Sequence, residues 1–332
     1  MSVALELAQA PAWAKALIPA ALEEIPGSGV WRITGDTITS TITDQFRADA
    51  ASYHMRYAAS AHFLALFRQA LAATGIVVAP SPAILDLGSG SGVNSIVPCL
   101  ELFPGARQVA TDLSAELLAI LADYARAEGF GDRVLPVVMD AMADHPAAGA
   151  FDLVTGASIL HHLVNPKRGL EVAARALKPG GHAVFLEPFD GYGLIRLAYQ
   201  RILAEAELRG ENALAPEAAA TLRGIATDLT ARTMPDVHDP NFAALDDKWL
   251  FSRELVEHMA RDSGFAEVRF VAHNDHPTLY RDVAGVHLRL GGFDGVSLPD
   301  WALAILDEFD AALPGPVKRL LMLEGTIVLT KG

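Results

Sequence analysis

Short apolar runs alternate with amphipathic segments of helix length between residues 83 and 188. Each run is apolar throughout, which is typical of strands in a parallel sheet that is covered on both faces. Consecutive strand–helix–strand units of this kind predict an α/β fold with a doubly wound, Rossmann-like sheet. The predicted core strands are residues 83–87, 108–111, 134–139, 151–155 and 182–186.

The chain after this core predicts two more strands and two long insertions. A helix at 252–262 precedes a strand at 265–271, and a strand at 326–330 completes a sheet of seven strands. Residues 190–250 contain two helical patterns and follow the carboxyl end of the fifth strand, the edge where open α/β sheets bind ligands. This insertion predicts a helical lid over the site or, alternatively, a packed helical subdomain. Residues 276–322 form the second insertion.

The chain before the core predicts a separate extension. Residues 1–60 combine helical patterns with a hairpin, formed by residues 31–34 and 37–39 around a turn at Gly35 and Asp36. A helix is expected from residue 60 to residue 73. We therefore predict a helical N-terminal extension over residues 1–60 and a main domain over residues 61–332.

Charge and composition narrow the class of partner. The 332 residues carry a formal net charge of -14, with 40 acidic against 26 basic side chains. This balance argues against a nucleic-acid-binding surface, which needs clustered Lys and Arg. The N-terminus does not resemble a signal peptide, and no run of about 18 apolar residues predicts a membrane span. With its single cysteine, Cys99, the chain is expected to be cytoplasmic, with no nucleic-acid or membrane partner.

A glycine-rich loop, Gly88-Ser89-Gly90-Ser91-Gly92, follows the first core strand. A dinucleotide fingerprint requires a third glycine where this chain has Val93, and the Lys of a nucleotide phosphate loop is absent from the motif. Asp86 precedes the loop, and a carboxylate there would repel a pyrophosphate and attract an ammonium or sulfonium group. The loop therefore favours a cationic ligand.

Further carboxylates end other core strands at what should be a common ligand-binding edge. Asp112 ends the second strand, Asp140 the third and Glu187 the fifth. An acid after the second strand can bind ribose hydroxyls in dinucleotide and adenosyl sites alike, so Asp112 alone does not discriminate between them. Each acid could alternatively cap the helix that follows its strand.

The motifs DLGSGSG, VATDLS, VVMDAM, FDLVTGASILHHL and LKPGGHAVFLEPF together resemble the class I S-adenosylmethionine-dependent methyltransferases. The resemblance covers about residues 83–188, and it extends to residues 251–265 and back to Phe46, Ala50 and Tyr53. One departure is Pro98, which removes a backbone donor from the helix after the loop and puts the geometry of that helix in doubt.

The resemblance implies a cofactor site for S-adenosyl-L-methionine. Asp86, Gly88, Ser89 and Gly90 would surround its methionine end, and Gly92 would keep the next helix close. The resemblance implies further contacts to ribose, adenine and the methionine portion from residues at the ends of the following strands. These residues are Asp112, Leu113, Asp140, Ala141, Met142, Ala157, Ser158 and Tyr53.

His161 and His162 follow the fourth strand on the ligand edge and are candidate catalytic residues, with His162 favoured as a base or acceptor-facing residue. Either histidine could instead cap or pack the next helix. Glu187 could orient the substrate or serve only as a structural acid. Weaker candidates of the same kind are Tyr192, His54 and Tyr57. His273 and His276 have a metal-ligand spacing, but no third cluster accompanies them, so no metal is expected.

The sequence therefore predicts a methyltransferase that transfers the methyl group of S-adenosylmethionine to an oxygen or nitrogen of a small, partly apolar molecule. Two alternatives remain: a non-catalytic module that binds the cofactor, and an NAD-dependent oxidoreductase, which Val93 and Asp86 disfavour. The N-terminal extension is compatible with a homodimer.

Overall fold

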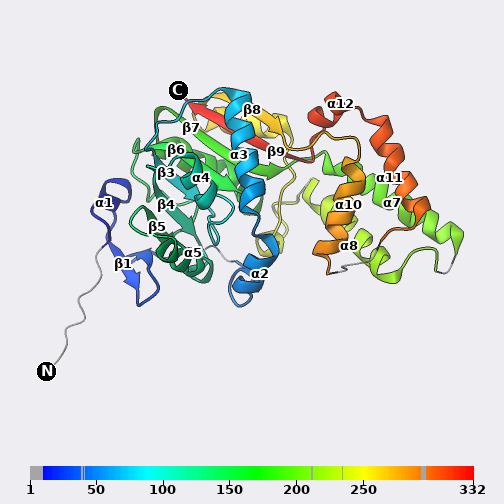
Figure 1. Cartoon of the computed structure of the whole chain (residues 1–332), viewed down its shortest axis with the longest axis horizontal. Helices are drawn as coiled ribbons and strands as arrows, with labels where there is room; N and C mark the ends of the chain where they lie inside the picture. The colour runs from blue at the N-terminus through cyan, green and yellow to red at the C-terminus, as the bar shows by residue number, and fades with distance from the viewer. Residues whose placement is uncertain (1–9, 39, 41, 211, 234, 293–296) are drawn as a thin grey trace.

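The computed structural model describes residues 10–38, 40, 42–210, 212–233, 235–292 and 297–332. In this part of the chain, nine strands form one sheet in the order β1-β2-β5-β4-β3-β6-β7-β9-β8 (Figure 1). Strands β5, β4, β3, β6 and β7 are mutually parallel, whereas β9 is antiparallel to both β7 and β8. The Rossmann-like α/β prediction is confirmed. The strands are β1 Leu22–Ile25, β2 Val30–Ile33, β3 Ala83–Leu87, β4 Arg107–Asp112, β5 Val134–Val138, β6 Phe151–Ala157, β7 Leu177–Pro188, β8 Phe265–Ala272 and β9 Glu324–Lys331.

The predicted count of seven strands is wrong for the whole sheet, because an N-terminal hairpin adds two. Its strands β1 and β2 pair antiparallel, and β2 then lies parallel to β5. The predicted turn at Gly35 is also wrong. The turn lies at residues 26–29, where Gly27 and Gly29 adopt φ angles of 73° and 71° that favour glycine. Thr39, in the second predicted hairpin strand, lies outside the described residues.

Helices cover both faces of the sheet. One face packs against α3, α4 and α5 through Ile84 and Ala110, and the other packs against α1, α6 and α9 through Leu85 and Leu87. This alternation follows from the opposite directions of successive side chains along a strand. The helices are α1 Ala14–Leu17, α2 Ala50–Tyr57, α3 Ser60–Thr74, α4 Ile96–Leu102, α5 Ala115–Ala127, α6 Pro166–Ala176 and α9 Arg253–Asp262.

Side-chain caps fix the starts of the core helices. Ser114 accepts a hydrogen bond from Leu117 N at the start of α5, and Asn165 accepts one from Arg168 N at the start of α6. Pro98 lies in the first turn of α4, where its missing N–H removes no intrahelical hydrogen bond. The doubt that Pro98 raised about this helix is thereby resolved.

The two insertions form a single helical lobe. Helices from both insertions share one apolar core, which includes Ile202, Leu222, Tyr280 and Leu306. Figure 1 shows this lobe to one side of the sheet. The lobe thus has the interior of a packed subdomain, and its movement as a lid stays a prediction. Its helices are α7 Tyr192–Arg209, α8 Pro216–Thr233, α10 Leu279–Leu290, α11 Asp300–Ala312 and α12 Gly315–Leu320. None of the described helices has the length and apolar character needed to cross a membrane.

A buried ion pair connects the helices of the second insertion. Lys318 on α12 is 1% exposed and donates to Asp310 Oδ1 at 2.6 Å, as well as to the carbonyls of His276 and Pro277. Asp310 also accepts from the backbone N–H of Tyr280 at the start of α10. One buried carboxylate thus joins α10, α11 and α12.

We expect Lys318→Met to destabilise the chain, because it leaves Asp310 charged, buried and without its cation. The free energy of unfolding should fall by about 3–5 kcal/mol, measured by urea denaturation with tryptophan fluorescence. Arg319→Met removes the neighbouring, exposed ion pair with Asp275 and serves as the control, with an expected change of about 0–1 kcal/mol. Equal losses in the two variants would contradict this assignment.

Candidate functional site

The glycine loop turns sharply after β3 at the carboxyl edge of the sheet. Gly88, Gly90 and Gly92 have φ angles of 66°, 52° and 73°, in the left-handed region that glycine adopts without strain. A Cβ on Gly88 or Gly92 would also lie 2.4 Å from the side chain of Ile159 or Leu121. Backbone conformation therefore favours glycine at all three positions, and close packing adds to this at Gly88 and Gly92.

Asp86 lies beneath the loop instead of facing a ligand. It is fully buried, and its carboxylate accepts hydrogen bonds from Ser95 Oγ at 2.7 Å and Thr155 Oγ1 at 2.5 Å. Burial raises the pKa of Asp86 to about 6, although these hydroxyl donors oppose the shift. The expected direct contact between Asp86 and the ligand is replaced by a structural role, in which the carboxylate joins β3 to α4 and β6.

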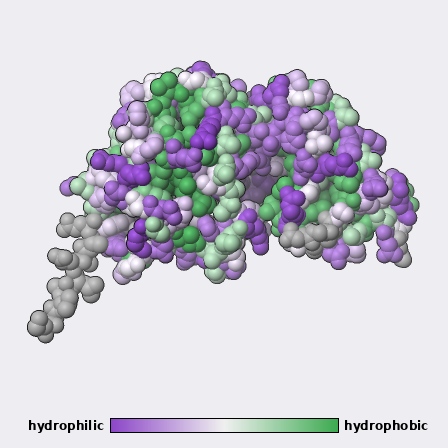
Figure 2. Space-filling model, in the orientation of Figure 1, coloured by the Kyte–Doolittle hydropathy of each residue, from purple (hydrophilic) through white to green (hydrophobic). Residues whose placement is uncertain are grey.

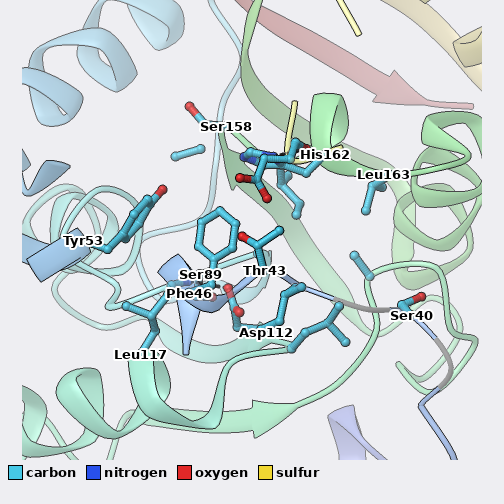
Figure 3. A pocket seen from close by; sticks show the side chains of 18 of the residues that line it. Ser40, Thr43, Phe46, Tyr53, Ser89, Asp112, Leu117, Ser158, His162 and Leu163 are labelled. Carbon is cyan, nitrogen blue, oxygen red and sulfur yellow. Dashed lines mark hydrogen bonds between the residues drawn. The ribbon is translucent and has the colours of Figure 1, made fainter. Parts of the chain in front are cut away.

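A cavity of about 660 Å³ opens along this edge of the sheet. Figure 3 shows Tyr53, Asp112 and His162 arranged around it. We call it the first cavity. The cofactor-site residues predicted from the sequence all line it except Asp86: Tyr53, Gly88, Ser89, Gly90, Gly92, Asp112, Leu113, Asp140, Ala141, Met142, Ala157 and Ser158.

Two carboxylates fix the backbone around the first cavity. Asp112 accepts from Gly90 N and Ser114 N, both at 2.8 Å. Burial raises the pKa of Asp112, and these backbone donors oppose the shift. Asp140 accepts from Met142 N at 2.8 Å and from the Ser40 hydroxyl. Each acid thus orders a turn while its carboxylate stays at the cavity wall.

The charges on the wall of the first cavity are mainly negative. Its described acids and amines are Asp112, Asp140, Asp246 and Lys248. The Lys248 ammonium already donates to the carbonyls of Leu245 and Asp246. Three carboxylates against one engaged ammonium favour a positively charged ligand over a pyrophosphate.

A second cavity of about 640 Å³ lies between the sheet and the helical lobe. Its wall combines aromatic and aliphatic side chains, such as Phe63, Ile225 and Leu229, with carboxylates and histidines. Figure 2 shows that the molecular surface is hollowed between the two lobes, with hydrophilic residues around the hollow. The two cavities share seven wall residues and therefore meet: Phe46, Tyr53, Tyr57, Ser158, His162, Leu245 and Asp246.

His161 is buried in a network of charged groups. Its Nδ1 donates to Glu187 Oε2 at 2.6 Å, and its Nε2 lies 3.4 Å from Asp247 Oδ1. Arg232 lies 3.0 Å from the other oxygen of Asp247. Burial alone lowers the pKa of His161, but the negative charges of Glu187 and Asp247 outweigh it and raise this pKa to about 9. His161 is thus held by partners on both ring nitrogens.

His162 lies at the junction of the two cavities. Its Nδ1 is 2.8 Å from the carbonyl oxygen of Asp246. A carbonyl only accepts, so we assign the proton of the neutral ring to Nδ1, which leaves Nε2 as an acceptor. Burial, together with the positive charge of His161, lowers the pKa of His162 to about 3. The neutral ring is therefore a hydrogen-bond acceptor and a weak base.

The other sequence candidates divide between the cavities. His54 lines the first cavity, where its Nδ1 lies 2.8 Å from Ser91 Oγ, and Tyr57 lines both cavities. Tyr192 lines the second cavity and donates to Glu324 at 3.0 Å. His273 and His276 point to different partners: His273 bonds Thr326, and His276 pairs with Asp282. Their sequence spacing does not create a shared site.

Three site residues have no sequence motif. Asp246, Asp247 and Arg232 come from the first insertion and line the second cavity. The adjacent acids at 246 and 247 resemble an ordinary solvated loop in the sequence. Ser158 has a positive φ of 63° without being glycine, a strain that often marks functional sites and that a sequence does not reveal.

Comparison with known proteins shows that the region around the first cavity is similar to methyltransferases. Residues 85–183 match a family model described as a methyltransferase domain. A release factor glutamine methyltransferase of Chlorobaculum tepidum is 44% identical over 87 residues, 25% of this chain and 29% of that protein. A demethylmenaquinone methyltransferase of Thermus thermophilus is 37% identical over 125 residues, 36% of this chain and 56% of that protein. The similar region thus makes up about half or less of each relative. The two relatives are named for different methyl acceptors.

A solved structure shows the same fold over most of the chain. Haemonchus contortus phosphoethanolamine N-methyltransferase 2, in complex with phosphomonomethylethanolamine and S-adenosylhomocysteine, aligns over 88% of this chain and 59% of that chain. The TM-score is 0.50 and the sequence identity 15%. At this identity the likeness concerns the fold alone.

We expect Thr155→Val to raise the pKa of Asp86 above its value of about 6, because the variant removes a hydrogen bond to the charged form. A carbon-13 titration of the carboxyl group measures this pKa. Since the folded pKa exceeds the unfolded one, Asp86 should make folding more favourable as the pH falls through about 6. Thr326→Val, another buried threonine, should leave this pKa unchanged. An ordinary aspartate pKa in the native chain would refute the burial argument.

Proposed function

We propose that this chain, whose residues 85–183 match a methyltransferase domain, is a class I S-adenosylmethionine-dependent methyltransferase that methylates an oxygen or nitrogen of a small, partly apolar molecule. The first cavity binds the cofactor, and the second cavity binds the acceptor. The observation that carries the proposal is that the two cavities meet at Ser158 and His162. An acceptor in the second cavity can thus reach a group held in the first.

The residues of the first cavity fit S-adenosylmethionine. Glycine at 88 and 90 lets a ligand approach the backbone closely. Asp112 accepts hydrogen bonds from the ribose hydroxyls, while Leu113 and Met142 pack against the adenine beside Asp140. The surplus of carboxylates favours the ammonium and sulfonium charges. Tyr53, from the N-terminal extension that we assign to residues 1–60, packs against Phe46 with ring centroids 4.9 Å apart and closes the methionine end.

Position, more than acid–base chemistry, is what the protein contributes. S-adenosylmethionine supplies a methyl group that its sulfonium already activates, so the side chains must hold the acceptor atom in line behind that methyl group. His162 serves as the acceptor-facing residue, because its neutral Nε2 can accept a hydrogen bond from an acceptor O–H or N–H. Its low pKa disfavours the role of general base. Glu187 and His161 position the segment that carries it.

The second cavity supports a small, partly apolar acceptor. A volume of about 640 Å³ is in the ordinary range for small-molecule sites. Its wall offers aromatic rings from the extension, α3 and α7, and aliphatic side chains from α8. A non-catalytic module would need no second cavity joined to the first, and an NAD-dependent enzyme would bring a pyrophosphate against three carboxylates. The homodimer and the cytoplasmic location stay predictions.

The cofactor assignment predicts that Asp112→Asn weakens binding of S-adenosylmethionine and S-adenosylhomocysteine by about 10- to 100-fold, because charge-assisted hydrogen bonds are lost. Isothermal titration calorimetry measures both affinities, with NADH titrated in parallel. Asp123→Asn removes an exposed carboxylate on α5 and should bind like the unmodified chain. Tight binding of NADH alone would overturn the assignment.

The acceptor assignment is tested by supplying the chain with S-adenosylmethionine and fractions of small molecules, proteins and RNA. We expect S-adenosylhomocysteine to form with the small-molecule fractions. With an acceptor in hand, Ile225→Trp should narrow the second cavity and lower kcat/KM for the acceptor at least about tenfold, with the cofactor affinity unchanged. Leu208→Trp, on the exposed face of α7, is the matched control. Methylation of protein or RNA alone would disprove a small-molecule acceptor.

A further inference from the structure

Three side chains converge where the two cavities meet. They are His161 and His162, which follow β6, and Asp247, which comes from the first insertion. One ligand atom from each lies within 4.8 Å of the other two. We propose that His161, His162 and Asp247 bind a divalent transition-metal cation at this junction. The cation site stands on these side chains alone, and its part in acceptor binding rests on the proposed function.

The distances in the cluster suit a shared cation better than hydrogen bonds. Asp247 Oδ1 lies 3.4 Å from His161 Nε2 and 3.3 Å from His162 Nδ1. Charge-assisted N–H···O⁻ bonds are shorter, at about 2.7–2.9 Å. Two ligand atoms that each lie about 2.0–2.1 Å from a metal are about 3.0–3.4 Å apart at octahedral or tetrahedral angles. The two Asp247 spacings match this second range, and all three ligand atoms lie within 4.8 Å of one another. A cation there would replace the hydrogen bond of 2.8 Å between His162 Nδ1 and the Asp246 carbonyl.

The surroundings of His161 have the arrangement of a supported metal ligand. Its Nδ1 donates to the buried carboxylate of Glu187 at 2.6 Å, which turns Nε2 toward Asp247. Glu187 is held in turn by the backbone N–H groups of Ile159 and Leu160. A carboxylate that orients a histidine while its other nitrogen binds metal is a recurrent feature of metal centres.

The local charge tolerates a cation. Arg232 contacts Asp247 at Oδ2 and leaves Oδ1 toward the histidines, and Arg232 also pairs with Asp228 at 3.1 Å. Glu187, Asp228, Asp246 and Asp247 all line the second cavity around this cluster. The carboxylates therefore outnumber the one guanidinium.

Two imidazoles and one carboxylate select for a class of metal. Such a set suits first-row transition metals such as Zn²⁺, Co²⁺ or Fe²⁺, whereas Mg²⁺ and Ca²⁺ prefer oxygen ligands. Three protein ligands leave coordination positions free. Because all three residues line the second cavity, those positions can take an oxygen of the acceptor. On cation binding His161 releases its Nε2 proton to solvent, and the proton of the neutral His162 ring moves from Nδ1 to Nε2, where it donates to an acceptor oxygen instead of accepting a hydrogen bond from it.

The test is calorimetry with the 332-residue chain after removal of metals by a chelator. We expect one equivalent of Zn²⁺ to bind and Mg²⁺ not to compete. His161→Gln and Asp247→Asn should each raise the Kd for Zn²⁺ by more than about 100-fold, because even outer-shell partners commonly contribute about 10- to 100-fold. Glu187→Gln alters only an outer-shell partner, so it should raise the Kd for Zn²⁺ by about 10- to 100-fold. His276→Gln, an exposed histidine beside Asp282, is the control and should bind Zn²⁺ unchanged.

Two outcomes would overturn the cation site: no stoichiometric binding of Zn²⁺, or binding that His161→Gln and Asp247→Asn leave intact. Should these variants fail to fold, the site can be tested in the native chain by titration with Co²⁺, followed by nuclear magnetic resonance. If the cation site is correct, the ring signals of His161 and His162 shift at lower Co²⁺ concentrations than those of the other histidines. S-adenosylmethionine is titrated against the same proteins. Loss of Zn²⁺ binding with intact cofactor binding supports the cation site, and failure of cofactor binding in the native chain counts against the proposed function instead.

Discussion

The site depends on one buried carboxylate, that of Glu187 at the end of β7. It accepts hydrogen bonds from the backbone N–H groups of Ile159, Leu160 and His161 and from the His161 ring. Burial of a carboxylate is tolerable only when its oxygens have such donors. Since any shift of the segment after β6 would break several of these bonds, Glu187 fixes where both histidines stand.

The second constraint is that neither insertion has a complete apolar core by itself. Helices α7 and α8 bury their apolar faces against α10 and α11, although α9 and β8 separate the two insertions in sequence. The lobe therefore has an apolar core of its own, and the second cavity lies between it and the carboxyl end of β7. The loop with Asp246 and Asp247 leads back from this lobe to the sheet and contributes to the junction between the cavities.

Local patterns were enough to predict the central sheet and the wall of the first cavity. The strand-end acids at 112 and 140 and the glycine loop lie where short sequence spacing puts them, because each follows its own strand directly. Asp86 was misjudged, since a sequence does not show whether a strand-end carboxylate faces the cavity or turns inward to Ser95 and Thr155. The N-terminal hairpin was misplaced because two stretches, at 26–29 and at 35–36, both carry turn residues.

The grouping of His161, His162 and Asp247 could not be predicted from the sequence. It joins a loop after β6 to a loop some 85 positions later, and the meeting of the two is decided by the packing of the helical lobe. The same holds for Arg232, whose burial beside Asp247 follows from α8. Long-range contacts of this kind leave no periodic signal in either segment.

The position of β9 also determines the order in which strands can pair while the chain is being synthesised. This strand lies between β7 and β8 in the sheet, yet it follows both in sequence and begins at Glu324. As the nascent chain leaves the ribosome, β8 has no neighbour to pair with, and β7 keeps an open edge. The sheet can be completed only after β9 has been synthesised, so folding of this part of the sheet comes late. Until then, a chaperone would have to shield the unpaired edges of β7 and β8.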